Sequence, residues 1–424
     1  MRIRFHFRAF LIAMALCAWC VAPLAAGENW PQFRGPNGDG ISDASDLPVK
    51  FGEAENLRWK TPMPGKAWSS PVVWGKQIWL TNATEDGKEI YFVCVDLDSG
   101  KVIYNTKLWD VVDPQAAIPK NSYASPTPAI EAGRVYLHFG SCGTVAIDTA
   151  TGKTVWERRD LPCNHFRGPA SSPIIVDNLL ILTFDGFDFN YLAALDKRTG
   201  ETVWRRDRNI QYDSNNGDYH KAFSTPQVIE VPGQPGKREM VSPSAGATIA
   251  YDPASGEELW RVRSGGMNAA ARPVFGNGLV YCTAPDGGFQ LFAVKPGGRG
   301  DVTTSHVAWK FAKGVPSRPS PMLLGDSIFM VANNGVASCI DAVAGTQVWQ
   351  HRFGGDYSAS PVYADGKLYF FDENGAAQVI DAKRQYNELA INHLDDGCMA
   401  SPAIVGRSLI VRTKSNLYRF EKTP

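Results

Sequence analysis

The stretch "AIDTATGKTVW", residues 146–156, returns several times along this chain of 424 residues. It recurs as "ALDKRTGETVW" (194–204), "AYDPASGEELW" (250–260) and "CIDAVAGTQVW" (339–349), and more loosely as "CVDLDSGKVIY" (94–104). Every copy places Asp, Gly and an aromatic residue at four-residue steps: Asp96, Gly100 and Tyr104; Asp148, Gly152 and Trp156; Asp196, Gly200 and Trp204; Asp252, Gly256 and Trp260; Asp341, Gly345 and Trp349. Such self-similarity predicts a repeat architecture.

A proline followed by a short apolar run precedes each of these phrases. The eight copies are "SSPVV" (69–73), "SPTPAI" (125–130), "SSPIIV" (171–176), "STPQVI" (224–229), "ARPVF" (271–275), "PSPML" (319–323), "ASPVY" (359–363) and "ASPAI" (400–404). Counting from Pro71 and Pro126, the period is 40 to 55 residues. A second β-type run, such as "RVYLHF" (134–139), stands between each proline and the Asp phrase, so each unit supplies four strands.

Four antiparallel strands at this period predict one blade of a β-propeller. In each unit the Asp is expected to bond nearby amides of a turn, the Gly to adopt positive φ, and the aromatic ring to lie between blades. The last unit ends after "SLIVRT" (408–413) and "LYRF" (417–420), one strand short. The orphan segment "NLRWKT" (56–61) with Trp59 can complete it. We therefore expect an all-β, eight-bladed propeller closed by pairing of its N- and C-terminal strands.

Two units depart from the pattern and are expected to be looser or to carry special loops. In the fifth, Lys295 replaces the Asp and the insertion "PGGRGDVTTSH" delays Trp309. In the seventh, Asp381 is followed by Gln385 and Leu389, so both the Gly and the Trp are missing.

The charge balance and the N-terminus limit which functions and locations the sequence supports. Lys plus Arg and Asp plus Glu both number 43, so no global field favours nucleic acid. Arg2, Arg4 and Arg8 precede an apolar run that ends near Ala25 and Ala26, the pattern of an export signal. We expect residues 1–27 to be a signal peptide, 28–55 an N-terminal arm and 56–424 the propeller. The mature chain is then periplasmic or secreted, does not span a membrane and is expected to be a monomer.

At this point the residues resemble a known family. The phrase "AIDTATGKTVW" is similar to the tryptophan-docking repeat of PQQ-like (pyrroloquinoline-quinone-type) eight-bladed propellers, and the resemblance covers roughly residues 56–420. The segment "NWPQFRGPNGDGIS" (29–42) resembles the lead-in of secreted members from planctomycete-type bacteria. The resemblance implies one of two branches: quinone-dependent alcohol and sugar dehydrogenases, or non-catalytic propellers such as the lipoprotein of the outer-membrane assembly machinery.

The sequence favours the non-catalytic branch. The dehydrogenases hold PQQ and Ca²⁺ in a central funnel, use an Asp base, and often carry two adjacent cysteines; the mature chain has no adjacent cysteines and no recognisable calcium set. We expect a binding or scaffolding module with no catalytic residue, metal or cofactor, whose partner is a protein or a small extracytoplasmic ligand. A PQQ- and calcium-dependent dehydrogenase is the alternative, and a carbohydrate-binding propeller is a further one.

In such propellers the loops that join each outer strand to the next inner strand build one mouth of the funnel. Those loops end just before the repeat prolines. They contribute the candidate ligand-binding residues Trp68, Tyr123, His165, Arg167, His220, Lys221, Asn268, Arg272, Arg318, Asp356 and Tyr357, together with Met399. Cations and aromatic rings suit an anionic ligand, a sugar or a peptide strand, although a water-filled funnel is also polar without a ligand. Strand counting places Cys142 and Cys163 on the same face, and we predict a disulfide between them.

Overall fold

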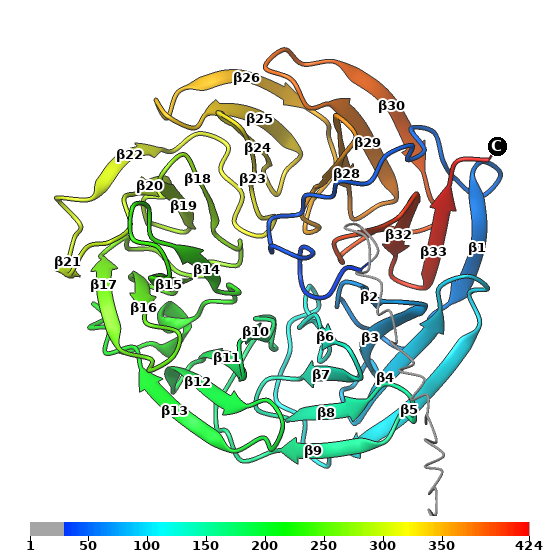
Figure 1. The fold of residues 1–424 in the computed structure, drawn as a ribbon, viewed down its shortest axis with the longest axis horizontal. Coiled ribbons are helices and arrows are strands. Elements are labelled where there is room, and N and C mark those ends of the chain that lie inside the picture. Colours follow the sequence, from blue (N-terminus) through cyan, green and yellow to red (C-terminus); the bar gives the residue numbers. More distant parts are fainter. Residues whose placement is uncertain (1–28, 424) are drawn as a thin grey trace, which may run out of the picture.

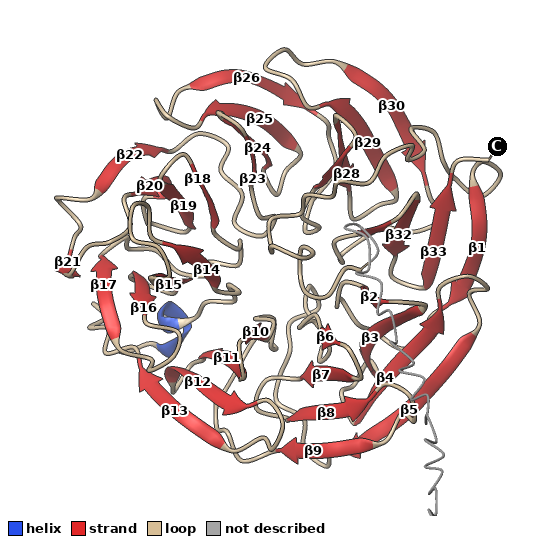
Figure 2. Ribbon diagram, in the orientation of Figure 1, coloured by secondary structure: helices blue, strands red, loops and turns tan. Residues whose placement is uncertain are grey.

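Eight antiparallel sheets surround a central axis in the computed structural model, which describes residues 29–423 (Figure 1). Within these residues the only helical element is the short 3₁₀ turn Gly217–His220 (Figure 2). No helix in this part of the chain combines the length and the apolar character needed to span a bilayer. The all-β, eight-bladed propeller predicted from the repeat is confirmed.

Each blade begins with a strand beside the axis and ends with one on the rim. Blade 1 contains β2 (Val72–Trp74), β3 (Gln77–Ala83), β4 (Glu89–Asp96) and β5 (Val102–Asp110). Blade 2 contains β6 (Ala129–Glu131), β7 (Arg134–His138), β8 (Thr144–Asp148) and β9 (Thr154–Arg158). Blade 3 contains β10 (Ile174–Val176), β11 (Leu179–Asp185), β12 (Asn190–Asp196) and β13 (Thr202–Asp207). Blade 4 contains β14 (Gln227–Glu230), β15 (Arg238–Pro243), β16 (Thr248–Tyr251) and β17 (Glu258–Val262).

The second half of the ring follows the same order. Blade 5 contains β18 (Val274–Gly276), β19 (Leu279–Ala284), β20 (Gln290–Val294) and β22 (Val307–Phe311). Blade 6 contains β23 (Met322–Leu324), β24 (Ser327–Val331), β25 (Val336–Asp341) and β26 (Gln347–Arg352). Blade 7 contains β27 (Val362–Ala364), β28 (Lys367–Phe371), β29 (Ala376–Asp381) and β30 (Glu388–His393). Blade 8 contains β31 (Ala403–Val405), β32 (Ser408–Arg412), β33 (Asn416–Glu421) and β1 (Leu57–Pro62).

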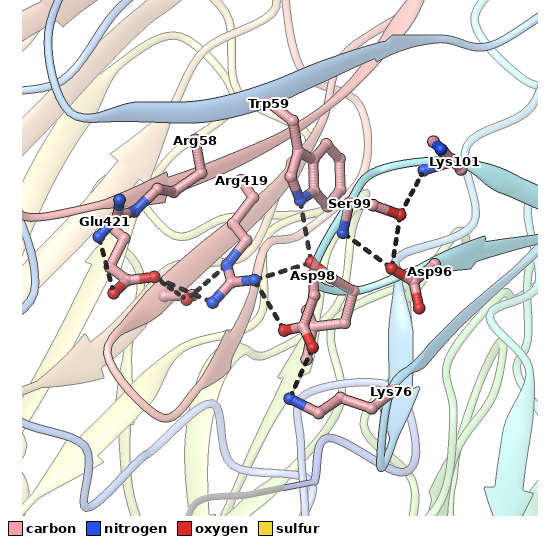
Figure 3. Close-up of polar contacts among 11 residues, drawn as sticks. Arg58, Trp59, Lys76, Asp96, Asp98, Ser99, Lys101, Arg419 and Glu421 are labelled. Carbon is pink, nitrogen blue, oxygen red and sulfur yellow. Dashed lines mark hydrogen bonds and ion pairs between the residues drawn. The ribbon is translucent and has the colours of Figure 1, made fainter.

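Blade 8 is built from both ends of the chain, as predicted. Strand β1 pairs antiparallel with β33, with Trp59 opposite Arg419 and Thr61 opposite Leu417. Side chains then tie this blade to blade 1 (Figure 3). Trp59 Nε1 and an Arg419 guanidinium nitrogen both donate to the Leu97 carbonyl oxygen, at 2.9 and 2.8 Å. Arg419 also pairs with Asp98 and Glu421.

The repeated Asp, Gly and aromatic residues form the contact between neighbouring blades. In the blade 3 turn, Asp196 Oδ1 accepts the amides of Arg198 and Thr199, and Gly200 adopts φ +78°. A methyl group on Gly200 would stand 2.7 Å from the indole of Trp156, so the ring lies directly on the glycine. Tyr104, Trp204, Trp309 and Trp59 cover Gly152, Gly256, Gly345 and Gly100 in the same way.

The two irregular units carry special features. The insertion of blade 5 contains β21 (Gly300–Asp301), which pairs in parallel with β17 and gives blade 4 a fifth strand. In blade 7 the missing glycine turn is replaced by a longer one, where Tyr386 packs edge-on against Trp349 and stacks on His351 at 4.0 Å. The lost docking contact is therefore replaced by another aromatic contact.

One repeat proline is corrected by the structure. Seven of the predicted prolines stand immediately before an inner strand, but β6 begins after Pro128 and not after Pro126. Proline fits this position because the first residue of a strand can forgo its ladder donor.

The N-terminal arm, residues 29–55, crosses the axis on the face that carries the turns after the inner strands (Figure 1). Trp30 forms a β-bridge with Val73, and Ile41 forms one with Tyr363. Phe51 then packs into the apolar core shared by blades 7, 8 and 1. The arm is therefore part of the folded ring.

Candidate functional site

A cavity of about 320 Å³ lies on the axis, on the face formed by the connectors between blades. Its upper wall carries Trp68, Ile118, Lys120, Asn121, Arg167, Phe223, Asn268, Asp286, Ser317, Arg318, Ser358 and Met399. Phe33 of the arm lines it as well. Since the arm lies across the far side of the ring, the cavity opens toward the connector face.

A ring of hydroxyl groups forms the lower wall of the cavity. The residue before each inner-strand proline donates its backbone N–H to the hydroxyl of the equivalent residue in the next blade, at 2.9 to 3.0 Å. The residues are Ser70, Thr127, Ser172, Thr225, Arg272, Ser320, Ser360 and Ser401. Arg272 has no hydroxyl to offer, so the ring is broken only between blades 4 and 5. These bonds hold the eight inner strands at fixed distances.

Charged side chains cross the upper part of the cavity. The connector between β5 and β6, residues 111–128, brings Lys120 to 2.5 Å from Glu373 of blade 7. Arg318 and Ser358 also bond the Glu373 carboxylate, at 3.4 and 2.7 Å. Arg167 forms a two-pronged pair with Asp218, a residue just outside the lining. Asn268 donates to Asp286 at 2.9 Å, so each of these carboxylates has a partner within the protein.

Three further guanidinium groups, those of Arg34, Arg272 and Arg412, are buried outside the lining of the cavity. Within residues 29–423, none of them donates to a carboxylate. Arg272 bonds the Phe33 carbonyl and Gln32 Oε1, and Arg412 bonds Ser69 and the Thr81 carbonyl. Burial lowers the pKa of Arg34 to about 10 and the pKa values of Arg272 and Arg412 to about 9. All three remain charged at neutral pH, and they raise the electrostatic potential of the cavity.

Four of the eleven predicted ligand-binding residues, Trp68, Arg167, Asn268 and Arg318, meet in this cavity, together with Met399. Tyr123 and His165 line a separate pocket of about 240 Å³ between blades 1, 2 and 3. His165 Nε2 accepts the Ser141 amide at 3.0 Å, and burial lowers its pKa to about 3, so the imidazole is neutral.

The remaining candidates point elsewhere. The Arg272 side chain turns down to the arm, and Tyr357 and Lys221 are buried within the ring. Burial lowers the Lys221 pKa to about 8, and its Nζ lies 5.0 Å from the Phe223 ring centroid. His220 stacks on Tyr212 with 3.9 Å between ring centroids. Asp356 is exposed and does not line the cavity.

The predicted disulfide between Cys142 and Cys163 is wrong in this structure, where both are free thiols. The two sulfurs belong to different apolar clusters. Cys163 packs with Leu161 and Tyr191 and places its Sγ 3.8 Å from His165 Nδ1, whereas Cys142 packs against the cluster that contains Trp109. Strand counting gave the correct face but not the direction of each side chain.

Sequence reasoning missed several lining residues, including Phe33, Lys120, Asn121 and Asp286. The hydroxyl ring had a visible signal, because Ser or Thr precedes the inner-strand proline in seven of eight units. Lys120 had none, since its place depends on the path of a long connector.

A comparison with family models assigns the chain to a family. The model described as "Outer membrane protein assembly factor BamB" matches residues 50–187, 188–311 and 298–420. The chain belongs to the BamB family of PQQ-like propellers. Among curated relatives, the chain is 22% identical to the BamB of Shewanella oneidensis over 313 residues, which is 68% of this chain and 72% of that protein.

Enzymes also occur among the proteins similar to this BamB-family chain. It is 24% identical over 253 residues to the tetrathionate hydrolase of Acidithiobacillus ferrooxidans, covering 57% of this chain but only 48% of that protein. The crystal structure of quinohemoprotein alcohol dehydrogenase from Comamonas testosteroni has a TM-score of 0.62 at 12% identity, covering 94% of this chain and 82% of that one. This likeness shows the fold alone.

The cavity wall of the BamB-family chain lacks the carboxylate cluster that would suit a calcium ion. Within residues 29–423, no three His, Cys, Asp or Glu side chains come together in a way that can hold a metal ion. Asp286 is the one carboxylate among the described residues of the lining, and Asn268 bonds it. A calcium ion takes six to eight oxygen ligands, which include carboxylates, carbonyls and water, and a single engaged carboxylate offers little negative charge for it.

Proposed function

We propose that the chain is an exported binding module that holds a carboxylate-bearing ligand in the central cavity and catalyses no reaction itself. The observation that carries this proposal is the positive charge at the cavity, whose wall contains Lys120, Arg167 and Arg318. The guanidiniums of Arg34, Arg272 and Arg412 are buried behind the wall and, within residues 29–423, donate only to uncharged oxygens. A bound anion would contact the cations of the wall directly and would be attracted by the buried guanidiniums through longer-range charge. The hydroxyl ring and the Arg318 guanidinium add donors at the site.

The rim supports a role in binding. Glu373, Asp286 and Asp218 are each engaged by a cation or an amide, so no carboxylate in the described part of this site stands ready as a general base. Lys120 and Arg318 are held by Glu373. A carboxylate of a ligand can displace Glu373 from these two side chains, so that both cations become available for binding.

The comparisons suggest a source for that carboxylate. Two relatives are named as outer membrane protein assembly factors. In a chain with such a role, an acidic segment of a partner protein would enter the open mouth on the connector face. A free organic acid shares the same chemistry. Export fits both sources; the signal peptide that would direct it, residues 1–27, lies outside the described residues.

Binding of model anions to the mature chain tests the proposal. Isothermal titration with hexaglutamate, citrate and uncharged hexaglutamine distinguishes a peptide source, a free acid and no charge preference. We expect hexaglutamate to bind in a salt-dependent manner and hexaglutamine not to bind. Arg318→Gln should weaken hexaglutamate about tenfold, because it removes a charge-assisted hydrogen bond. Arg384→Gln, which alters an exposed arginine on the rim of blade 7, should leave binding unchanged.

Two results would overturn this function. Equal affinity for hexaglutamine, or equal loss in both variants, would show that the cavity does not select anions. Dye-linked oxidation of an alcohol or aldose by the chain with PQQ and Ca²⁺ would establish the dehydrogenase instead. Binding of neutral sugars with no effect of charge would favour the carbohydrate-binding alternative.

A further inference from the structure

On the side of the ring where the arm lies, one charged group of the arm is in an unusual setting. Arg34 of the arm is buried, and its guanidinium points into the ring between blades 6 and 7. The acceptors are four backbone carbonyls: Pro321 at 3.0 Å, Pro361 at 3.4 Å, Ser320 at 3.5 Å and Asp39 of the arm itself. Among residues 29–423 no carboxylate bonds this guanidinium, so carbonyl dipoles alone recognise its charge.

These carbonyls face the axis because the first strand of each blade is an edge strand. An innermost strand has a neighbour on its outer side only, which leaves backbone groups along the axial edge without a ladder partner. The residues Ser320, Pro321 and Pro361 stand at this edge, where β23 and β27 begin. A guanidinium is planar and presents five donors in a fixed fork, so a single group reaches several of these oxygens. A lysine ammonium would reach fewer of them.

The arm backbone around Arg34 has no space for an additional side chain beside the guanidinium. Gly40 has φ +83°, and a methyl group there would lie 2.9 Å from Arg34 Nη2 and 3.0 Å from the Pro361 carbonyl oxygen. Gly38 has φ +72°, and a methyl group there would lie 2.3 Å from Arg272 Cζ. Both glycines combine a left-handed backbone with close contact, so the segment is shaped around two guanidiniums.

Arg272 makes the reciprocal contact. It belongs to blade 5 and donates to the Phe33 carbonyl oxygen at 2.6 Å, while Arg34 belongs to the arm and donates to blades 6 and 7. Arg272 also stands at the one position where the hydroxyl ring is broken. The blade that lacks the hydroxyl is thus one of the blades that hold the arm.

We propose that the axial edge of blades 6 and 7, on the side where the arm lies, is a guanidinium-binding site, which Arg34 of the same chain fills. The site is formed by the carbonyls of blades 6 and 7 and does not depend on covalent attachment of the guanidinium to the arm. It therefore accepts a small alkylguanidinium from solution once the Arg34 side chain has been removed. The arm is thus a tethered ligand of this site.

Chemical rescue of Arg34→Ala in the mature chain tests the site. N-ethylguanidinium should raise the melting temperature of the variant in a saturable manner, by about 2–3 °C at ten times its Kd, because it binds only the folded state. It should not raise the melting temperature of the wild type. Ethylammonium at equal concentration should have little effect, since it lacks the planar fork of donors.

Arg407→Ala is the matched control, because Arg407 also bonds the arm, through Asp46, but is exposed. The proposal is overturned if N-ethylguanidinium fails to stabilise folded Arg34→Ala, or if it stabilises Arg407→Ala or the wild type to the same extent. An equal effect of ethylammonium would also overturn it. If Arg34→Ala does not fold alone, the test is whether N-ethylguanidinium restores the native circular dichroism during refolding, and failure at saturating concentration counts against the site.

Discussion

Lys221 shows how strongly burial inside the ring changes the pKa of one side chain. It is a polar connector residue in sequence, yet its side chain is buried and its Nζ has no hydrogen-bond partner among residues 29–423. The Phe223 ring faces it, and Asp185, Asp218 and Arg167 act on it only through longer-range charge. Burial dominates and lowers the pKa from 10.5 to about 8.

This shift predicts a pH-dependent effect of Lys221→Met. Below pH 8 the amine is protonated in both the folded and the unfolded chain, so the full cost of burying the charge is present. Between pH 8 and 10.5 the folded chain releases the proton and the unfolded chain keeps it, so wild-type stability rises relative to the variant. At pH 7 the pH-linked part of the difference should favour the variant by about 3 kcal/mol, and this part disappears by about pH 10.5.

Urea unfolding of both chains across this pH range measures the difference. Lys153→Met, at an exposed lysine of a rim turn, provides the control and should show no change between pH 7 and 10.5. A gap between Lys221→Met and wild type that stays constant over this range would contradict a buried, unpartnered amine.

The turn between the two outer strands of a blade is the element that the repeat specifies most fully. In Gly200 of blade 3 the positive φ and the covering Trp156 ring act together, whereas Gly233 in an exposed turn of blade 4 has φ +73° and open space around it. Gly200→Ala should cost about 2–3 kcal/mol of stability, from backbone strain plus displacement of the indole. Gly233→Ala should cost only about 1 kcal/mol, from backbone strain.

Thermal or urea unfolding of the two alanine variants separates these contributions. Equal losses would mean that the Trp156 contact adds nothing beyond the turn geometry. A loss in Gly200→Ala that exceeds the loss in Gly233→Ala measures the contact between the two blades.

The same turns explain why the fold could be predicted. Asp, Gly and the aromatic residue lie within nine positions of each other, and they specify both a hairpin and its contact with the next blade. The missing strand of the last unit then required Trp59 to complete it, as the pairing of β1 with β33 shows. Only Pro126 was assigned incorrectly, because a second proline stands two residues later.

The site could be predicted only in part, because connectors lack such local rules. Arg272 and Arg318 both lie near a repeat proline, yet one turns to the arm and the other to the cavity. Their directions depend on which segments cross the axis, and the arm and the 111–128 connector come from far away in sequence. The break in the hydroxyl pattern at Arg272 was visible in sequence, but its meaning depended on the arm.

At the scale of the whole molecule, stability depends on the closure between blades 8 and 1. Trp59 and Trp309 make matched contacts: each half-buried indole covers a turn glycine and donates its N–H to a carbonyl of the next blade. Only Trp59 belongs to β1, which has β33 as its sole partner strand. Trp59→Ala should therefore release β1 locally, whereas Trp309→Ala should leave β1 paired.

Hydrogen exchange resolved by segment tests this difference. Trp59→Ala should speed exchange of the β1 and β33 amides by about a hundredfold, the equivalent of about 2–3 kcal/mol of lost closure. Trp309→Ala should leave these two strands protected. Faster exchange spread evenly over all eight blades in Trp59→Ala would show that the ring opens as one unit.

The single gap in the hydroxyl ring also breaks the symmetry of the molecule. Eight similar blades around one axis would offer a docking peptide eight nearly equivalent orientations. Because Arg272 replaces one hydroxyl, one blade differs from the other seven, and the arm has a single preferred orientation around the axis. The gap therefore marks one rotational position around the axis, and the arm is bound at that position.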